Sequence, residues 1–203
     1  MKILVTGFKP FLGEKINPSE QLALTLQNKF TQVSAVSLKV IYSECVEELK
    51  SAIELNQPDI LIMLGQAGGR SAITVEKIAL NYHQARAADE SGYRPDVGPI
   101  INHLPLAQIT TFPVDDLVFA MSKNHSIETS CHAGTFVCNY LFHQALVLFP
   151  QLNPVFIHVP FLPEQIGHYT GEAQGISLQK PVMTFEDQKL IPYAVPGGIF
   201  LSI

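Results

Sequence analysis

The 203-residue sequence lacks the features that mark membrane, secreted and nucleic-acid-binding proteins. Its apolar runs are shorter than the ~18 residues that a membrane helix needs, and the apolar segment after Met1 is too short for a secretory signal. Lysine and arginine do not cluster and the net charge is -5, so we expect no nucleic-acid partner. The cysteines are three, an odd number, which favours a reducing, cytoplasmic location over a disulfide framework.

Internal repeats, low-complexity tracts and linkers are also missing from the chain. Hydrophobic residues make up 47% of the sequence and charged residues 15%, which is typical of a globular protein with a sizeable core. A chain of this length buries one such core. The sequence therefore predicts a single domain over residues 1–203.

Short apolar runs alternate with segments of helical periodicity along the chain. This alternation predicts a three-layer α/β/α fold with a twisted, largely parallel central sheet. The long polar segment 81–111 predicts an excursion over the surface. Strands are expected at 2–8, 33–40, 60–64, 73–80, 126–130 and 154–160, and helices after the caps Asn17, Ser43 and Thr135 and over 114–121.

Cys138, in the segment AGTFVCN, has two interpretations. If Thr135 caps a helix that runs to Phe149, Cys138 lies in its first turn. Unpaired backbone N–H groups and the helix dipole at that position stabilise a thiolate and lower the pKa of a thiol. The flanking residues are mostly apolar, however, and an inert cysteine in the core fits them as well. The local sequence leaves both interpretations open.

His158 and Glu76 are polar residues inside apolar strands. Near the carboxyl end of a central strand, His158 would face the same edge of the sheet as Cys138, although a histidine inside a strand is more often a hydrogen-bonded core residue than a base. A buried carboxylate at Glu76 needs a partner. It could orient the His158 imidazole, pair with Arg86, or face water on an edge strand.

Neither a metal site nor a cofactor site is predicted. The spacings of Cys131, His132, Cys138 and His143 match no common zinc arrangement. The glycine-rich segment GQAGGR lacks the Lys-Ser/Thr of a phosphate loop and the spacing of a dinucleotide fingerprint. We therefore expect chemistry that uses side chains alone.

Several long motifs occur in the order typical of the pyroglutamyl peptidase I (pyrrolidone-carboxylate peptidase) family, which the chain resembles over roughly residues 1–165. They are VTGFKPFLGEKINPS, LGQAGGR, ITVEKIALN, ARAADESGY, AGTFVCNYLF and FIHVPFLPEQ. The resemblance implies a phosphorylase/hydrolase-like α/β fold, no cofactor, and a homo-oligomer, either tetramer or dimer. It also implies a cysteine exopeptidase with Cys138 as the nucleophile and His158 and Glu76 completing the triad.

The same resemblance implies how the substrate is held. Gln66 of GQAGGR and the two phenylalanines of GFKPF, Phe8 and Phe11, would hold the pyroglutamyl ring, and Arg86 would lie near the reacting carbonyl. The expected reaction removes N-terminal pyroglutamate from peptides through a thioester acyl-enzyme. The alternatives are another cysteine amidohydrolase or deamidase on this scaffold, or a binding protein without turnover.

The sequence departs from the family pattern at three places. Leu12 stands where the family usually has glycine, which reshapes the edge of the pocket. Residues 84–92 read QARAADESG where DARIPDNEG is typical, so the segment that covers the substrate is expected to differ. In the tail, about 186–203, Pro196 would break the long amphipathic helix with which the family generally ends.

Overall fold

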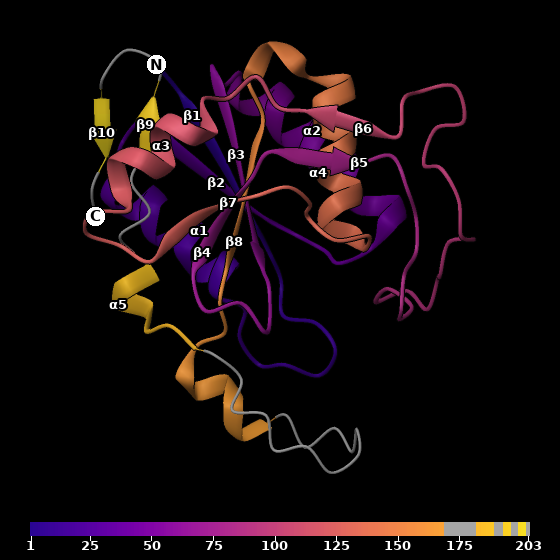
Figure 1. Cartoon of the computed structure of the whole chain (residues 1–203), viewed down its shortest axis with the longest axis horizontal. Helices are drawn as coiled ribbons and strands as arrows, with labels where there is room; N and C mark the ends of the chain where they lie inside the picture. Colours follow the sequence, from indigo (N-terminus) through magenta and orange to yellow (C-terminus); the bar gives the residue numbers. More distant parts are fainter. Residues whose placement is uncertain (169–181, 189–192, 196–198, 202–203) are drawn as a thin grey trace.

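The computed structural model describes the backbone of residues 1–168, 182–188, 193–195 and 199–201. A six-stranded sheet runs through its centre in the order β2-β1-β3-β8-β4-β7 (Figure 1). Neighbouring strands are parallel except β4 and β8, which are antiparallel. The largely parallel sheet is thus confirmed. Its strands are β1 (Ile3–Phe8), β2 (Val33–Leu38), β3 (Ile60–Gln66), β4 (Ile73–Glu76), β7 (Ile127–Ser130) and β8 (Val155–Val159).

Helices cover both faces of this sheet, as Figure 1 shows. Helices α1 (Pro18–Lys29) and α3 (Val114–Met121) enclose one apolar core, and α2 (Tyr42–Asn56) and α4 (Val137–Leu148) enclose the other. The α/β/α layers are therefore as predicted. Within the described residues, no helix combines the length and apolar character needed to cross a lipid bilayer.

The helix starts show which local signals were sufficient. The Asn17 side chain accepts a hydrogen bond from the Ser19 backbone N–H, so the predicted cap of α1 is confirmed. The predicted Ser43 cap is wrong, because α2 begins at Tyr42, two residues before the start that a Ser43 cap implies. Ile41 occupies its cap position and offers no side-chain oxygen. Instead, Asp89 from the long surface segment accepts the Tyr42 N–H at 2.9 Å.

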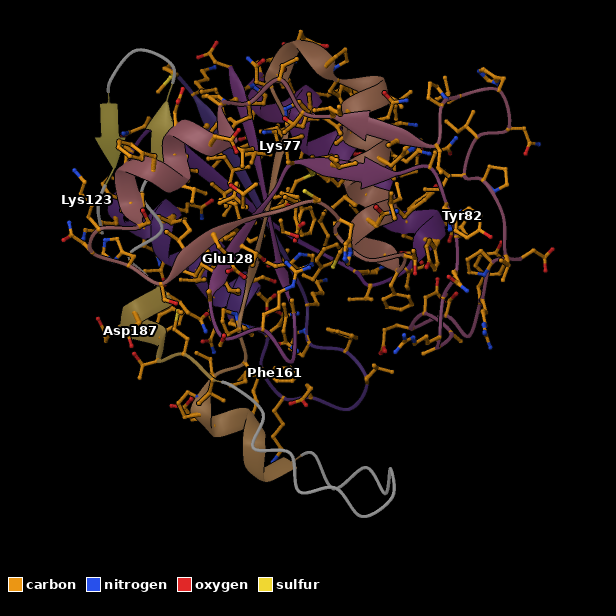
Figure 2. All side chains as sticks on the ribbon, in the orientation of Figure 1. Lys77, Tyr82, Lys123, Glu128, Phe161 and Asp187 are labelled. Carbon is orange, nitrogen blue, oxygen red and sulfur yellow. The ribbon has the colours of Figure 1, made fainter. Side chains whose placement is uncertain are left out.

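The strand predicted over 73–80 is two strands. β4 ends at Glu76, and β5 (Ile78–Leu80) pairs with β6 (Ala107–Ile109) in a separate two-stranded sheet. Lys77, labelled in Figure 2, separates them, and its ammonium forms an ion pair with the exposed carboxylate of Asp115. Because β4 is buried between two strands, a lysine cannot continue its buried pattern, and the chain turns away.

The tail contains no long helix among its described residues. A four-residue helix, α5 (Phe185–Gln188), precedes two short antiparallel strands, β9 (Tyr193–Val195) and β10 (Ile199–Leu201). One short helical turn, η1 (Pro150–Leu152), precedes β8 in the chain, and another, η2 (Pro163–His168), follows it. Pro196, on which the predicted helix break rests, lies outside the described residues.

His143 is an ionisable side chain on the buried face of α4. It is 0% exposed, and within the described part of the chain neither ring nitrogen has a hydrogen-bond partner. Burial, with a smaller effect of nearby His83, lowers the pKa of His143 to about 4. Between about pH 4 and 6.5, His143 is therefore neutral in the folded protein and protonated in the unfolded chain.

We expect acid to destabilise the fold through this residue. An unfolded histidine binds a proton below its usual pKa of about 6.5, so the stability present above that pH is lost as the pH falls towards 4. Linkage gives a loss of about 2 kcal/mol at pH 5. Urea unfolding should show that the free energy of unfolding falls less between pH 7 and pH 5 in His143→Leu than in the wild type. The control is His103→Leu, because His103 is exposed; it should lose as much unfolding free energy as the wild type. An equal loss in wild type and His143→Leu would contradict the assignment.

Candidate active site

Three adjacent strands and one helix start bring the predicted catalytic side chains together. His158 on β8 pairs in register with Gly65 of β3 and with Thr74 of β4. The Cys138 sulfur packs over Gly65, so closely that a Cβ added to this glycine would lie only 3.1 Å from Sγ. Glycine at this position therefore makes room for the thiol beside His158.

Glu76 is hydrogen-bonded to His158. Its Oε1 lies 2.7 Å from His158 Nδ1, and both side chains are buried. β4 lies between β8 and β7, so the edge-strand interpretation of Glu76 is wrong. The orienting contact expected from the sequence is present.

Arg70, rather than Arg86, forms the salt bridge with Glu76. Its Nη1 contacts Glu76 Oε1 and the Thr74 hydroxyl, and its Nη2 donates to the His132 carbonyl at 3.2 Å. The predicted Glu76–Arg86 pairing is therefore wrong. Arg70 is the last residue of GQAGGR and lies six positions before Glu76. This proximity in sequence could have predicted the salt bridge.

The environment fixes the charges of this pair. Burial raises the pKa of Glu76, but the contacts of the carboxylate with His158, Ser130 and Arg70 together outweigh it, so the pKa is lowered and the carboxylate is ionised. Burial lowers the pKa of His158, and the Glu76 contact only partly offsets this, so the imidazole is neutral at neutral pH. Since Nδ1–H donates to Glu76, we assign the free lone pair to Nε2.

The start of α4 differs from the prediction. Thr135 does not cap the helix; its hydroxyl donates to the Gln84 carbonyl, and Phe136 takes the cap position without a side-chain hydrogen bond. Gly134, at φ 79°, allows the preceding turn. Cys138 still lies in the first turn of α4, which begins at Val137.

The Cys138 thiol is protonated in the resting protein. Burial and the negative charge of Glu76 raise its pKa to about 12, against the smaller lowering effects of Arg70 and the Cys138 backbone N–H. The predicted lowering of the pKa is wrong, because desolvation outweighs the helix start. A thiol of this kind needs an adjacent base to become a nucleophile.

A pocket of about 690 Å³ opens beside this start of α4. Phe11 and Arg86 line it, together with Leu12, Gly68, Leu80, Gln84, Ala87, His132, Gly134, Thr135 and Phe136. Phe8 does not, because its side chain is only 2% exposed and packs in the core between the sheet, α2 and α4. Of the two phenylalanines predicted to hold the ring, Phe11 therefore lines the pocket and Phe8 lies in the core.

Gln66 ends β3, one residue after the glycine beneath the thiol. Its Oε1 accepts a hydrogen bond from Gln165 Nε2 at 2.9 Å, and Gln165 Oε1 in turn accepts the Leu162 backbone N–H. These contacts fix the orientation of the Gln66 amide. Gln165 donates to the amide oxygen rather than bonding the NH₂ group. Sequence reasoning missed Gln165, although it closes the motif FIHVPFLPEQ.

Comparison with known proteins places this arrangement in a family. The pyroglutamyl peptidase family profile matches residues 1–188. The chain belongs to the pyroglutamyl peptidase family. The pyrrolidone-carboxylate peptidase of Levilactobacillus brevis is 39% identical over 178 residues, covering 84% of this chain and 87% of the relative. That of Lactobacillus acidophilus is 42% identical over 173 residues, covering 82% and 86%.

Solved structures of the family share the fold. The crystal structure of the pyrrolidone carboxyl peptidase from Fervidobacterium islandicum AW-1 superposes with a TM-score of 0.81 at 32% identity. The match covers 93% of this chain and 92% of that one. The family likeness therefore extends from motifs to three-dimensional architecture.

The two departures expected from the sequence, at Leu12 and over residues 84–92, meet at the pocket. Leu12 lines it, and the Leu12 backbone N–H donates to Glu90 Oε1 at 3.0 Å. Glu90 belongs to the altered segment 84–92, and its own N–H donates to the Val40 carbonyl. The altered turn and the altered segment are thus joined to each other.

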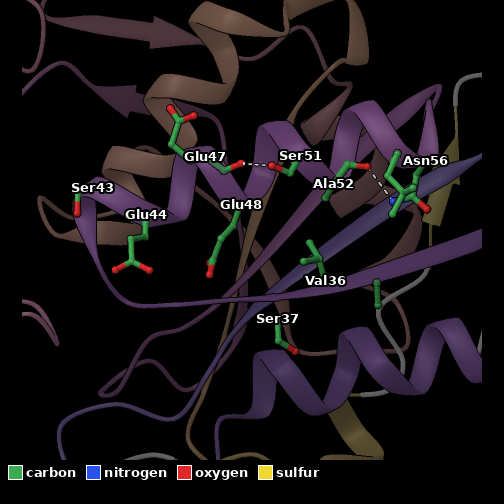
Figure 3. Close-up of a pocket in the computed structure, with 11 residues that line it drawn as sticks. Val36, Ser37, Ser43, Glu44, Glu47, Glu48, Ser51, Ala52 and Asn56 are labelled. Atoms are coloured by element: carbon green, nitrogen blue, oxygen red, sulfur yellow. Dashed lines mark hydrogen bonds between the residues drawn. The ribbon is translucent and has the colours of Figure 1, made fainter.

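A second hollow, of about 640 Å³, lies between α2 and the edge strand β2 (Figure 3). Ser37, Glu44, Glu47 and Glu48 line it, and none of the predicted site residues does. Lys39 and Lys50 pair with these carboxylates. The residues that the structure describes contain no cluster of three or more His, Cys, Asp or Glu able to hold a metal ion. Of the predicted site residues, Phe11 and Arg86 line the pocket beside the start of α4.

Proposed function

We propose that this protein is a cysteine peptidase that removes N-terminal pyroglutamate from peptides. The observation that carries the proposal is a thiol packed against Gly65, the strand neighbour of the carboxylate-anchored His158 imidazole, in a member of the pyroglutamyl peptidase family. A half-buried thiol and an oriented base together form a nucleophile. Relatives that bear the name pyrrolidone-carboxylate peptidase support the choice of substrate.

The first step forms a thioester. His158 Nε2 takes the proton of the Cys138 thiol as the sulfur attacks the pyroglutamyl carbonyl carbon. The resulting imidazolium donates from Nδ1 to the ionised Glu76, which stabilises its charge. Backbone N–H groups in the first turn of α4, assisted by Arg86 in the pocket, stabilise the tetrahedral oxyanion.

The second step releases both products. His158 returns the proton to the leaving amine as the C–N bond breaks, which leaves the pyroglutamyl group on Cys138 as a thioester. A water molecule, deprotonated by the same imidazole, then attacks the thioester carbonyl. The thiolate leaves and regains the proton, and free pyroglutamate departs.

Recognition of the lactam fits the pocket's chemistry. The ring is small, uncharged and has one apolar edge, so we assign that edge to Phe11, which is partly buried at the pocket wall. The NH₂ of Gln66 is suited to donate to the ring carbonyl, since Gln165 already occupies its oxygen. Phe8 supports the site only through core packing.

A panel of chromogenic amides tests this function. We expect release of the amine from the pyroglutamyl amide and at least a hundredfold slower release from the glutaminyl and prolyl amides, since each lacks part of the lactam. Pretreatment with a thiol-alkylating reagent should abolish release. Equal cleavage of all three amides would contradict the substrate assignment and favour a broader amidohydrolase, and no cleavage would favour a binding protein.

A further inference from the structure

The turn Phe11-Leu12-Gly13-Glu14 has an unusual central residue. The Glu14 N–H donates to the Phe11 carbonyl at 3.1 Å and closes the turn. Leu12 and Gly13 have φ values of 53° and 79°, both in the left-handed region. Glycine adopts this region freely, whereas a leucine side chain is strained there.

Core packing does not compensate for that strain. The Leu12 side chain is 56% exposed and absent from both apolar cores. It is one of the walls of the 690 Å³ pocket, next to Phe11. An exposed, strained apolar residue at a pocket is a feature for which binding gives a reason and stability does not.

The position of Leu12 is also fixed. Its backbone N–H donates to Glu90 Oε1, and the Glu90 N–H is held by the Val40 carbonyl. The turn is thereby tied to the segment that leads from Arg86, another pocket residue. Leu12 thus presents an apolar surface from a held backbone.

We propose that Leu12 forms an apolar subsite for the side chain that follows pyroglutamate, so the preferred substrates carry a large apolar residue there. This rests on the proposed function. Phe11 is partly buried and Leu12 exposed, so the wall runs from the ring site outwards towards the leaving peptide. The pocket is far larger than a five-membered lactam, which leaves room for a further side chain.

The test compares kcat/KM for pyroglutamyl-X-amides with X as Leu, Phe, Ala and Asp. In the wild type, Leu and Phe should exceed Ala by about tenfold, the scale of a few buried methylene groups. Leu12→Gly, which suits the left-handed turn, should bring this ratio close to one. Leu106→Gly is the matched control, because Leu106 is an exposed leucine, at 67%, outside the pocket.

Three outcomes overturn the subsite. They are a wild type without apolar preference, a Leu12→Gly variant that keeps the preference, and a Leu106→Gly variant that loses it equally. All three require cleavage of pyroglutamyl peptides, which distinguishes them from failure of the function itself. If no pyroglutamyl-X-amide is cleaved, the proposed function fails and the subsite with it.

Discussion

Replacement of Cys138 by alanine is expected to lower kcat for pyroglutamyl hydrolysis by about 10⁵- to 10⁶-fold, the loss typical of a removed nucleophile. The pocket walls and the Gln66–Gln165 contact do not depend on the thiol. Binding of a pyroglutamyl peptide should therefore survive in the variant. Steady-state kinetics and calorimetric titration measure the two effects separately.

Cys131→Ala is the matched control, because Cys131 is an exposed thiol outside the pocket. It should retain wild-type turnover. Hydrolysis by Cys138→Ala within tenfold of wild type would refute the nucleophile. A loss of peptide binding together with unfolding would instead assign Cys138 to the core, the alternative that the local sequence left open.

Glu76→Gln is expected to lower turnover by about 10³- to 10⁴-fold, less than loss of the nucleophile, as for the carboxylate of other triads. A neutral amide cannot stabilise the imidazolium that forms when His158 takes the thiol proton. Because Cys138 and Glu76 act as one unit, the double variant should be no slower than Cys138→Ala.

The same substitution should make the resting thiol more acidic. The charge of Glu76 raises the pKa of Cys138, so its removal lowers that pKa and speeds alkylation at a given pH. Glu76 also raises the pKa of His158, so the acid limb of kcat/KM, which lies below 6.5 in the wild type, should move to lower pH. Turnover and thiol reactivity thus change in opposite directions.

Urea unfolding must accompany these assays, since Arg70 loses its ionic partner in Glu76→Gln. Glu47→Gln, which removes an exposed carboxylate paired with Lys50, should change neither turnover nor alkylation. A folded Glu76→Gln variant with wild-type kcat would assign Glu76 to a structural role. Slower alkylation would contradict the account of the thiol pKa.

The fold was predictable where local periodicity decides it. Apolar runs and helical periodicity suffice to predict the layers of the α/β/α fold, and the Asn17-Pro18 pair suffices to predict the start of α1. The start of α2 was not predictable in this way, because its first N–H is satisfied by Asp89, 47 residues away. The break after Glu76 depends on the burial of β4 between its neighbours, which periodicity in one segment does not reveal.

The candidate site was likewise predictable only where local sequence decides it. A carboxylate inside an apolar strand indicates a buried partner, but for Glu76 this left both His158 and Arg86 open, and only the family resemblance favoured the His158 contact that the structure contains. Its second partner, Arg70, depends on how the loop after β3 folds back over β4. The thiol pKa could not be predicted from position in the helix, because desolvation and the nearby Glu76 charge are tertiary properties.

Mass spectrometry of the acid-quenched enzyme tests the central claim most directly. Mixing with a pyroglutamyl ester, whose leaving group departs readily, should load one pyroglutamyl acyl group, and peptide mapping should place it on Cys138. Thiol alkylation beforehand should prevent loading. Rapid release of pyroglutamate with no acyl group on Cys138, or with the group on another residue, would contradict the mechanism.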